Sequence, residues 1–164
     1  MSARLARSTA AAALGAALVL AGLTGCTFMT PQATTEHYEP SDGINATVGE
    51  LEVRNALLLS ADGTSASLLV SIQNPTKYGV QVNVQYEDAD NAKVDDTIYI
   101  NAGSVGSFGG ADSARILLSG VDAKPGTLFP VYFQYEDVSG KQLWVPVLDG
   151  SLSEYADLVP DAAP

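Results

Sequence analysis

The stretch Val80-Gln81-Val82-Asn83-Val84-Gln85-Tyr86 decides the fold class of this chain. Its three valines alternate with two glutamines and an asparagine, and successive side chains of a β-strand point to opposite faces of the sheet. The alternation therefore predicts a strand that has one buried face and one hydrated face.

The same signal recurs on both sides of this stretch, in short runs separated by turn residues. We predict strands over 46–59, 65–73, 80–86, 96–100, 114–118, 129–135 and 142–148. Asp62-Gly63, Asn74-Pro75, Lys124-Pro125-Gly126 and Ser139-Gly140 supply the turns between them. Because no window after residue 25 has a helical period, we predict an all-β fold. The spacing favours a β-sandwich of about seven strands with immunoglobulin-like or cupredoxin-like topology.

Six apolar side chains are predicted to face the interior of the sandwich: Val82, Val84, Ile116, Leu118, Val131 and Phe133. Pro146 has no N–H group to donate to a neighbouring strand. Its strand is therefore predicted to lie at an edge or to bulge at this residue.

The composition excludes several kinds of site. The chain of 164 residues has one Cys and one His, so an internal disulfide, a cysteine-based zinc site and any site with two imidazoles are all excluded. We predict no cofactor and no metal. The single His37 lies in a segment without apolar periodicity, where we expect it to be solvated rather than a metal ligand.

The N-terminal segment has the features of a targeting sequence. Arg4 and Arg7 precede an uncharged run from Ser8 to Leu23, which leads into Leu23-Thr24-Gly25-Cys26. This last tetrapeptide resembles a bacterial lipobox, which implies that Cys26 carries a diacylglycerol and becomes the mature N-terminus. The alternatives are an ordinary signal peptide with an unrelated Cys, or an uncleaved anchor.

These features divide the chain into a signal peptide (1–25), a lipid-anchored flexible tether (26–41), a β-sandwich domain (42–157) and a disordered tail (158–164). Without residues 1–25 the chain has 6 basic and 19 acidic side chains, a formal net charge of −13. Nucleic acid is therefore not an expected partner, because phosphate binding needs clustered Lys and Arg. Attachment to the membrane must come from acyl chains.

Two loop segments resemble ligand-binding sites, one for calcium and one for phosphate, but neither has the required spacing. Asp88, Asp90, Asn91, Asp95 and Asp96 could suggest calcium, but the spacing does not fit an EF-hand, and we expect a solvated hairpin loop; a looser calcium site is the alternative. The glycines between 103 and 110 lack a phosphate-binding spacing and are expected to form a flexible loop. A Ser-His-acid site would have to use the tether histidine, so we expect no enzyme.

Three aromatic residues are candidates for partner binding: Trp144, Tyr86 and Tyr135. Trp144 lies between Leu143 and Val145 and faces away from them. We expect a loop to cover it, the alternative being an exposed binding anchor. Each of these two tyrosines is the second residue of a repeated Gln-Tyr-Glu-Asp sequence, and we expect both to be half-exposed. A duplicated recognition surface is the alternative explanation of the repeat.

The order of segments from about residue 48 to 147 resembles the PCuAC-type periplasmic copper chaperones. The resemblance rests on 67–75, on 114–121 with the turn at 124–126, and on 129–133 and 145–147. It is closer still to secreted actinobacterial lipoproteins with that fold, and it implies a cupredoxin-like sandwich. The family's His-x-Met copper pair, however, falls on Arg115 and Leu117, so the resemblance does not extend to copper binding.

Together these observations predict a lipoprotein on the extracytoplasmic face of the cell membrane. We expect it to act as a non-catalytic binding or accessory module of the cell envelope, with the membrane and an envelope protein as its partners. The alternative is a copper-chaperone-like, metal-handling protein with a relocated or degenerate site.

Overall fold

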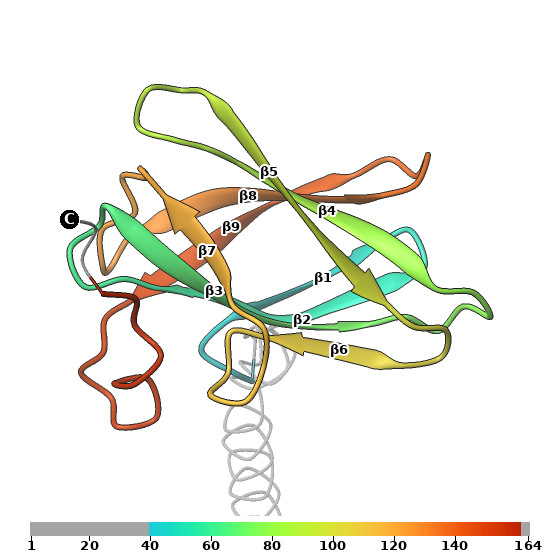
Figure 1. Cartoon of the computed structure of the whole chain (residues 1–164), viewed down its shortest axis with the longest axis horizontal. Coiled ribbons are helices and arrows are strands. Elements are labelled where there is room, and N and C mark those ends of the chain that lie inside the picture. Colours follow the sequence, from blue (N-terminus) through green and yellow to red (C-terminus); the bar gives the residue numbers. More distant parts are fainter. Residues whose placement is uncertain (1–39, 162–164) are drawn as a thin grey trace, which may run out of the picture. The chain divides into compact units, whose positions relative to one another are not determined.

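A computed structural model of the chain describes residues 40–161, which form nine β-strands and no helix (Figure 1). The strands are β1 (Ile44–Val48), β2 (Leu51–Leu59), β3 (Ser65–Gln73), β4 (Val80–Glu87), β5 (Lys93–Ile100), β6 (Val105–Phe108), β7 (Ile116–Ser119), β8 (Leu128–Tyr135) and β9 (Lys141–Leu148). The all-β prediction is confirmed. The described part of the chain contains no helix that could span a membrane.

Two strands were not anticipated from the sequence. The predicted strand over 46–59 is the hairpin of β1 and β2, which turns at Gly49, a residue with a φ of +57°. The segment expected to be a flexible glycine loop contains β6, which pairs with β3. Gly109 permits this pairing, because a Cβ atom there would collide with the backbone of Leu68.

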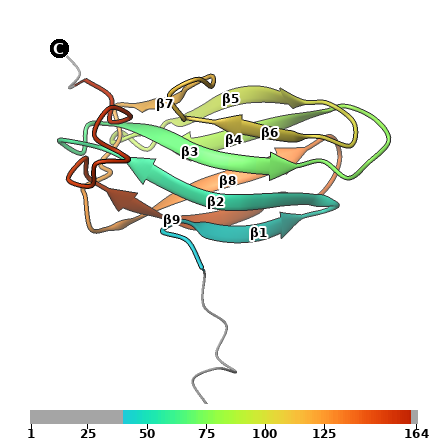
Figure 2. The same cartoon turned by 90° about the horizontal axis from the view of Figure 1, so that it is seen from below.

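The strands form two sheets packed face to face (Figure 2). The first sheet contains β1, β2 and β3, with β6 and β7 both pairing along β3; the second has the order β5-β4-β8-β9. The sheets are joined at one edge by a short parallel contact, in which Leu58 and Leu59 of β2 pair with Val147 and Leu148 of β9. The domain is therefore a sandwich closed along one side.

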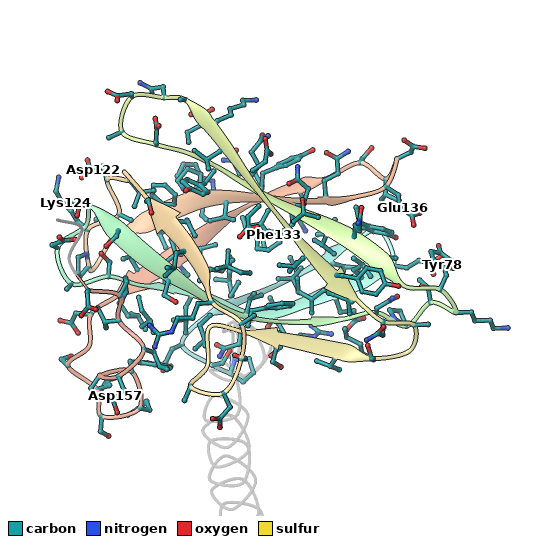
Figure 3. All side chains as sticks on the ribbon, in the orientation of Figure 1. Tyr78, Asp122, Lys124, Phe133, Glu136 and Asp157 are labelled. Atoms are coloured by element: carbon teal, nitrogen blue, oxygen red, sulfur yellow. The ribbon has the colours of Figure 1, made fainter. Side chains whose placement is uncertain are left out.

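The interior between the sheets holds all six side chains predicted for the core, each at most 2% exposed. Phe133 is the largest fully buried side chain and lies near the centre of the domain (Figure 3). Its strand, β8, is paired with β4 on one side and with β9 on the other.

Pro146 lies where β9 has a partner on one side only. It is opposite Leu128 of β8, while the pairing of β9 with β2 begins at the next residue, Val147. β9 as a whole lies between β8 and β2 and shows no bulge at Pro146, so the predicted edge position holds only for the part of the strand before Val147.

The chain after β9 covers the outer face of the first sheet. Tyr155 and Leu158 are buried against Leu57 and Leu59 of β2 and form a second, smaller apolar cluster. The prediction of a disordered tail from residue 158 is therefore wrong at its start, because Leu158 supplies apolar surface that β2 needs to bury. Residues 162–164 lie outside the described part.

A hydrogen bond ties this C-terminal segment to the beginning of the domain. The Tyr155 hydroxyl donates to the Asp42 carboxylate over 2.7 Å. Burial, followed by this hydrogen bond and the charge of Asp42, raises the pKa of Tyr155 to about 12.

Candidate functional site

Trp144 is exposed on the outer face of the second sheet, with 55% of its surface accessible. Its neighbours Leu143 and Val145 are buried, as the alternation along β9 predicted. The expectation that a loop covers Trp144 is wrong, because alternation assigns a side chain to a face but carries no information on what lies over that face. Trp144 is exposed, as the alternative required, and its role as a binding anchor stays a prediction.

The strand register places Trp144 among side chains from four strands. One row across the sheet contains Asp95, Gln85, Tyr132 and Gln142, in the order β5, β4, β8, β9. The next row contains Lys93 opposite Glu87 and Pro130 opposite Trp144.

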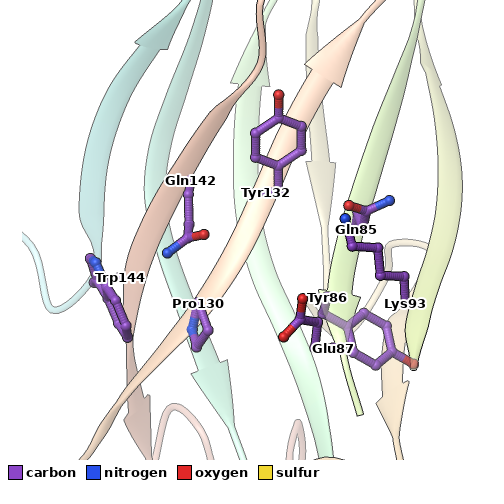
Figure 4. Close-up of a pocket in the computed structure, with 8 residues that line it drawn as sticks. All are labelled: Gln85, Tyr86, Glu87, Lys93, Pro130, Tyr132, Gln142 and Trp144. Carbon is purple, nitrogen blue, oxygen red and sulfur yellow. The ribbon is translucent and has the colours of Figure 1, made fainter. Parts of the chain in front are cut away.

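Residues of these two rows surround a surface hollow of about 570 Å³. We call it the Trp144 groove, and Figure 4 shows the residues that line it: Gln85, Tyr86, Glu87, Lys93, Pro130, Tyr132, Gln142 and Trp144. The groove combines aromatic surface with side-chain amides, and its two charged residues have opposite signs.

The polar side of the groove is organised by Asp95 at the edge strand β5. Its Oδ1 accepts hydrogen bonds from the amides of Gln85 (2.7 Å) and Asn83 (3.0 Å). These two bonds hold the pKa of Asp95 below its usual range, so the carboxylate stays ionised and keeps both amides oriented.

A second hollow of about 270 Å³ continues the same face beyond Gln85. It is lined by Gln81, Asn83, Thr97, Gln134, Tyr135 and Glu136. Thr97, Asn83 and Gln134 form the row of the sheet next to that of Gln85. The amide-rich surface therefore extends across three consecutive rows.

Tyr132 owes its position to a glycine in the turn that precedes the neighbouring strand β9. A Cβ atom at Gly140 would overlap the ring of Tyr132, so the ring lies over a position that only glycine leaves free. This arrangement leaves Tyr132 half-buried beside Trp144.

The other two aromatic candidates, Tyr86 and Tyr135, border the two hollows but contribute little surface to them, and the expectation that they are half-exposed is wrong. Tyr86 and Tyr135 are 5% and 3% exposed. The Tyr86 hydroxyl accepts the backbone N–H of Ser119 (3.1 Å), and the Tyr135 hydroxyl accepts that of Glu50 (3.0 Å). A buried hydroxyl needs a partner, and here each one ties the second sheet to the first.

The acidic loop forms part of the β4–β5 hairpin, and its carboxylates hold their own backbone. Asp88 Oδ1 accepts the N–H groups of Asp90 and Ala92, and Asp96 Oδ1 accepts that of Thr97. Within residues 40–161 no three His, Cys, Asp or Glu side chains are grouped so as to bind a metal ion.

The remaining sequence-based candidates fall in two places. Arg115 is exposed and donates a hydrogen bond to the carbonyl of Asp157 (3.1 Å), and Leu117 is 51% exposed. The other candidates lie outside the described residues: Cys26, His37, the predicted signal peptide (1–25) and the predicted tether as far as residue 39.

The sequence reasoning missed Tyr132, Gln85 and Gln142 as site residues. All three lie at outward-facing positions of strands with a clear alternation of apolar and polar residues. The sequence was therefore sufficient to predict that these side chains point outward. Their convergence with Trp144 depends on β4, β8 and β9 being neighbours, which no local pattern encodes.

Comparison with known proteins gave no family model, no curated protein and no solved structure that matches the chain. The fold and the site together define an all-β sandwich domain with an open aromatic and amide-lined groove on one face.

Proposed function

We propose that this protein is a lipid-anchored, non-catalytic binding module on the extracytoplasmic face of the cell envelope, and that the Trp144 groove is its binding surface. The observation that carries the proposal is the exposure of Trp144 within a hollow. Water-exposed tryptophans in concave sites are typical anchors of binding interfaces.

The electrostatics of the groove favour binding over catalysis. General acid–base catalysis works best with a group whose pKa lies near the working pH. Asp95, next to the groove, has a lowered pKa and is committed to two amide hydrogen bonds. Such a carboxylate orients its neighbours and is a poor proton donor.

The binding role is tested by photo-crosslinking in living cells that express the full chain. A diazirine amino acid replaces Gln142 in the groove or, as a control, Leu117 on the other sheet. We expect a discrete adduct from position 142 only, and its loss when Trp144→Ala is added. Equal adducts from both positions, or an adduct at 142 that survives Trp144→Ala, would contradict the proposal.

The anchor is tested separately, by Cys26→Ser. The acidic mature chain has no basic patch with which to adsorb on anionic lipids. We expect the variant to leave the membrane fraction and appear in the soluble or secreted fraction. Its retention in the membrane pellet would contradict lipid anchoring and leave the groove proposal unaffected.

A further inference from the structure

The Trp144 groove presents two aromatic side chains as diagonal neighbours. Tyr132 is opposite Gln142 in the register, and Trp144 is opposite Pro130, so the two aromatic residues are two positions apart on adjacent strands. The Cα atoms of diagonal neighbours in an antiparallel pair are about 7–8 Å apart. The Tyr132 ring lies over Gly140, on the side away from Trp144 (Figure 4), so the two rings are separate platforms rather than one continuous aromatic surface. The C–H face of a sugar ring stacks well on an aromatic face, so two such platforms suit a ligand that consists of several sugar residues.

The polar lining of this face is dominated by primary amides. Gln85 and Gln142 lie in the groove, and Asn83 and Gln134 continue the face beyond it. An amide carries both donors and an acceptor, and a sugar hydroxyl likewise donates and accepts.

The charge of the groove favours an uncharged ligand. Its two charged residues, Glu87 and Lys93, lie opposite each other on β4 and β5. The lining of the groove therefore has no net charge. The mature chain as a whole is acidic, so anionic ligands are repelled over the range of the Debye length.

An extended peptide fits this face less well. A peptide that adds to a sheet pairs with an open strand edge, whereas β4 and β8, which form the floor of the groove, are each paired on both sides. The groove therefore offers a ligand side chains and almost no backbone groups.

From these observations we infer that the Trp144 groove binds a linear chain of neutral sugar residues, with rings stacked on Trp144 and Tyr132 and hydroxyls bound by the amides. The inference rests on the proposed binding function and specifies its ligand class.

The chain carries its own reporter for this site, because Trp144 is its only tryptophan. The full-length protein, in a detergent without a sugar headgroup, is titrated with neutral hexasaccharides of glucose, mannose, galactose, arabinose and N-acetylglucosamine, and separately with a proline-rich decapeptide. We expect a saturable change in tryptophan emission with at least one hexasaccharide, unaffected by added salt, and none with the peptide.

Variants establish whether the response comes from the groove. Tyr132→Ala keeps the fluorophore and should weaken hexasaccharide binding at least about tenfold, the loss expected when one anchoring contact is removed. Gly140→Ala, which displaces the Tyr132 ring, should weaken it in the same direction. Leu117→Ala changes a side chain on the other sheet that is about as exposed as Trp144. This variant should bind as the unmodified chain does.

The outcomes separate this inference from the proposed function. A saturable response to the peptide alone, or no response to any hexasaccharide while the crosslinked adduct at position 142 persists, overturns the sugar inference and leaves the binding module standing. The absence of both the response and the adduct overturns both proposals.

Discussion

Phe133 and Tyr132 are adjacent on β8 and face opposite sides of the second sheet, and their truncation should have very different consequences. Phe133 is 0% exposed, and its strand is held between β4 and β9, so the surroundings cannot collapse far into a cavity. Phe133→Ala is therefore expected to cost about 4 kcal/mol of unfolding free energy, within the range for buried aromatic residues. In a domain of this size that loss lowers the Tm by roughly 10–20 °C.

Tyr132→Ala is the matched control for this measurement. Its ring rests on Gly140 at the surface, and cross-strand contacts of this kind contribute about 0.2–1 kcal/mol. Urea denaturation of the full chain, followed by far-ultraviolet circular dichroism, measures both variants. If Tyr132→Ala destabilised the protein as much as Phe133→Ala, the assignment of inner and outer faces on β8 would be refuted.

Three further measurements test other parts of the structure. Because the pKa of Tyr155 is raised from 10.0 to about 12 in the folded protein, its hydroxyl stabilises the fold below pH 10 and loses this effect as the pH rises to about 12. The difference in unfolding free energy between the unmodified chain and Tyr155→Phe should shrink over that interval; a constant difference would contradict the raised pKa, of which burial is the largest cause. Tyr135→Phe should cost about 0.5–1.5 kcal/mol in urea denaturation, since it removes the part-buried hydrogen bond from the Glu50 N–H, and a cost near zero would contradict that contact. The chain should not take copper(I) from a chelator in a competition titration, because soft ligands are lacking in its domain; stoichiometric, sub-nanomolar binding would restore the copper-chaperone hypothesis.

The fold class could be predicted because alternation is local. Val80 to Tyr86 shows which residues face inward without reference to any other part of the chain, and β3 was predicted with its observed bounds. The strand β6 was missed because four glycines lie within or beside it, at 103, 106, 109 and 110, and glycine commonly indicates a loop. Here Gly109 has a different role, since only a residue without Cβ can approach Leu68 so closely.

The candidate site was only half predictable. Alternation placed Trp144 on the outer face, but whether it was covered depended on the path of distant segments. The C-terminal segment covers the outer face of the other sheet, where Leu57 and Leu59 supply an apolar surface to bury. The outer face around Trp144 offers amides and charges instead, so burying it would cost the hydration of those groups.

The repeated Gln-Tyr-Glu-Asp sequence links the stability of the sandwich to the shape of its groove. Its two copies lie on the adjacent antiparallel strands β4 and β8, with Val82 opposite Tyr135. In each copy the tyrosine points inward and accepts a backbone N–H from the other sheet, while the preceding glutamine points outward. These two hydrogen bonds attach β4 and β8, the strands that carry Gln85 and Tyr132, to the first sheet. The groove therefore has its shape before a ligand binds. Binding to a preformed groove requires little ordering of the protein and therefore costs little conformational entropy, which supports the proposed binding role.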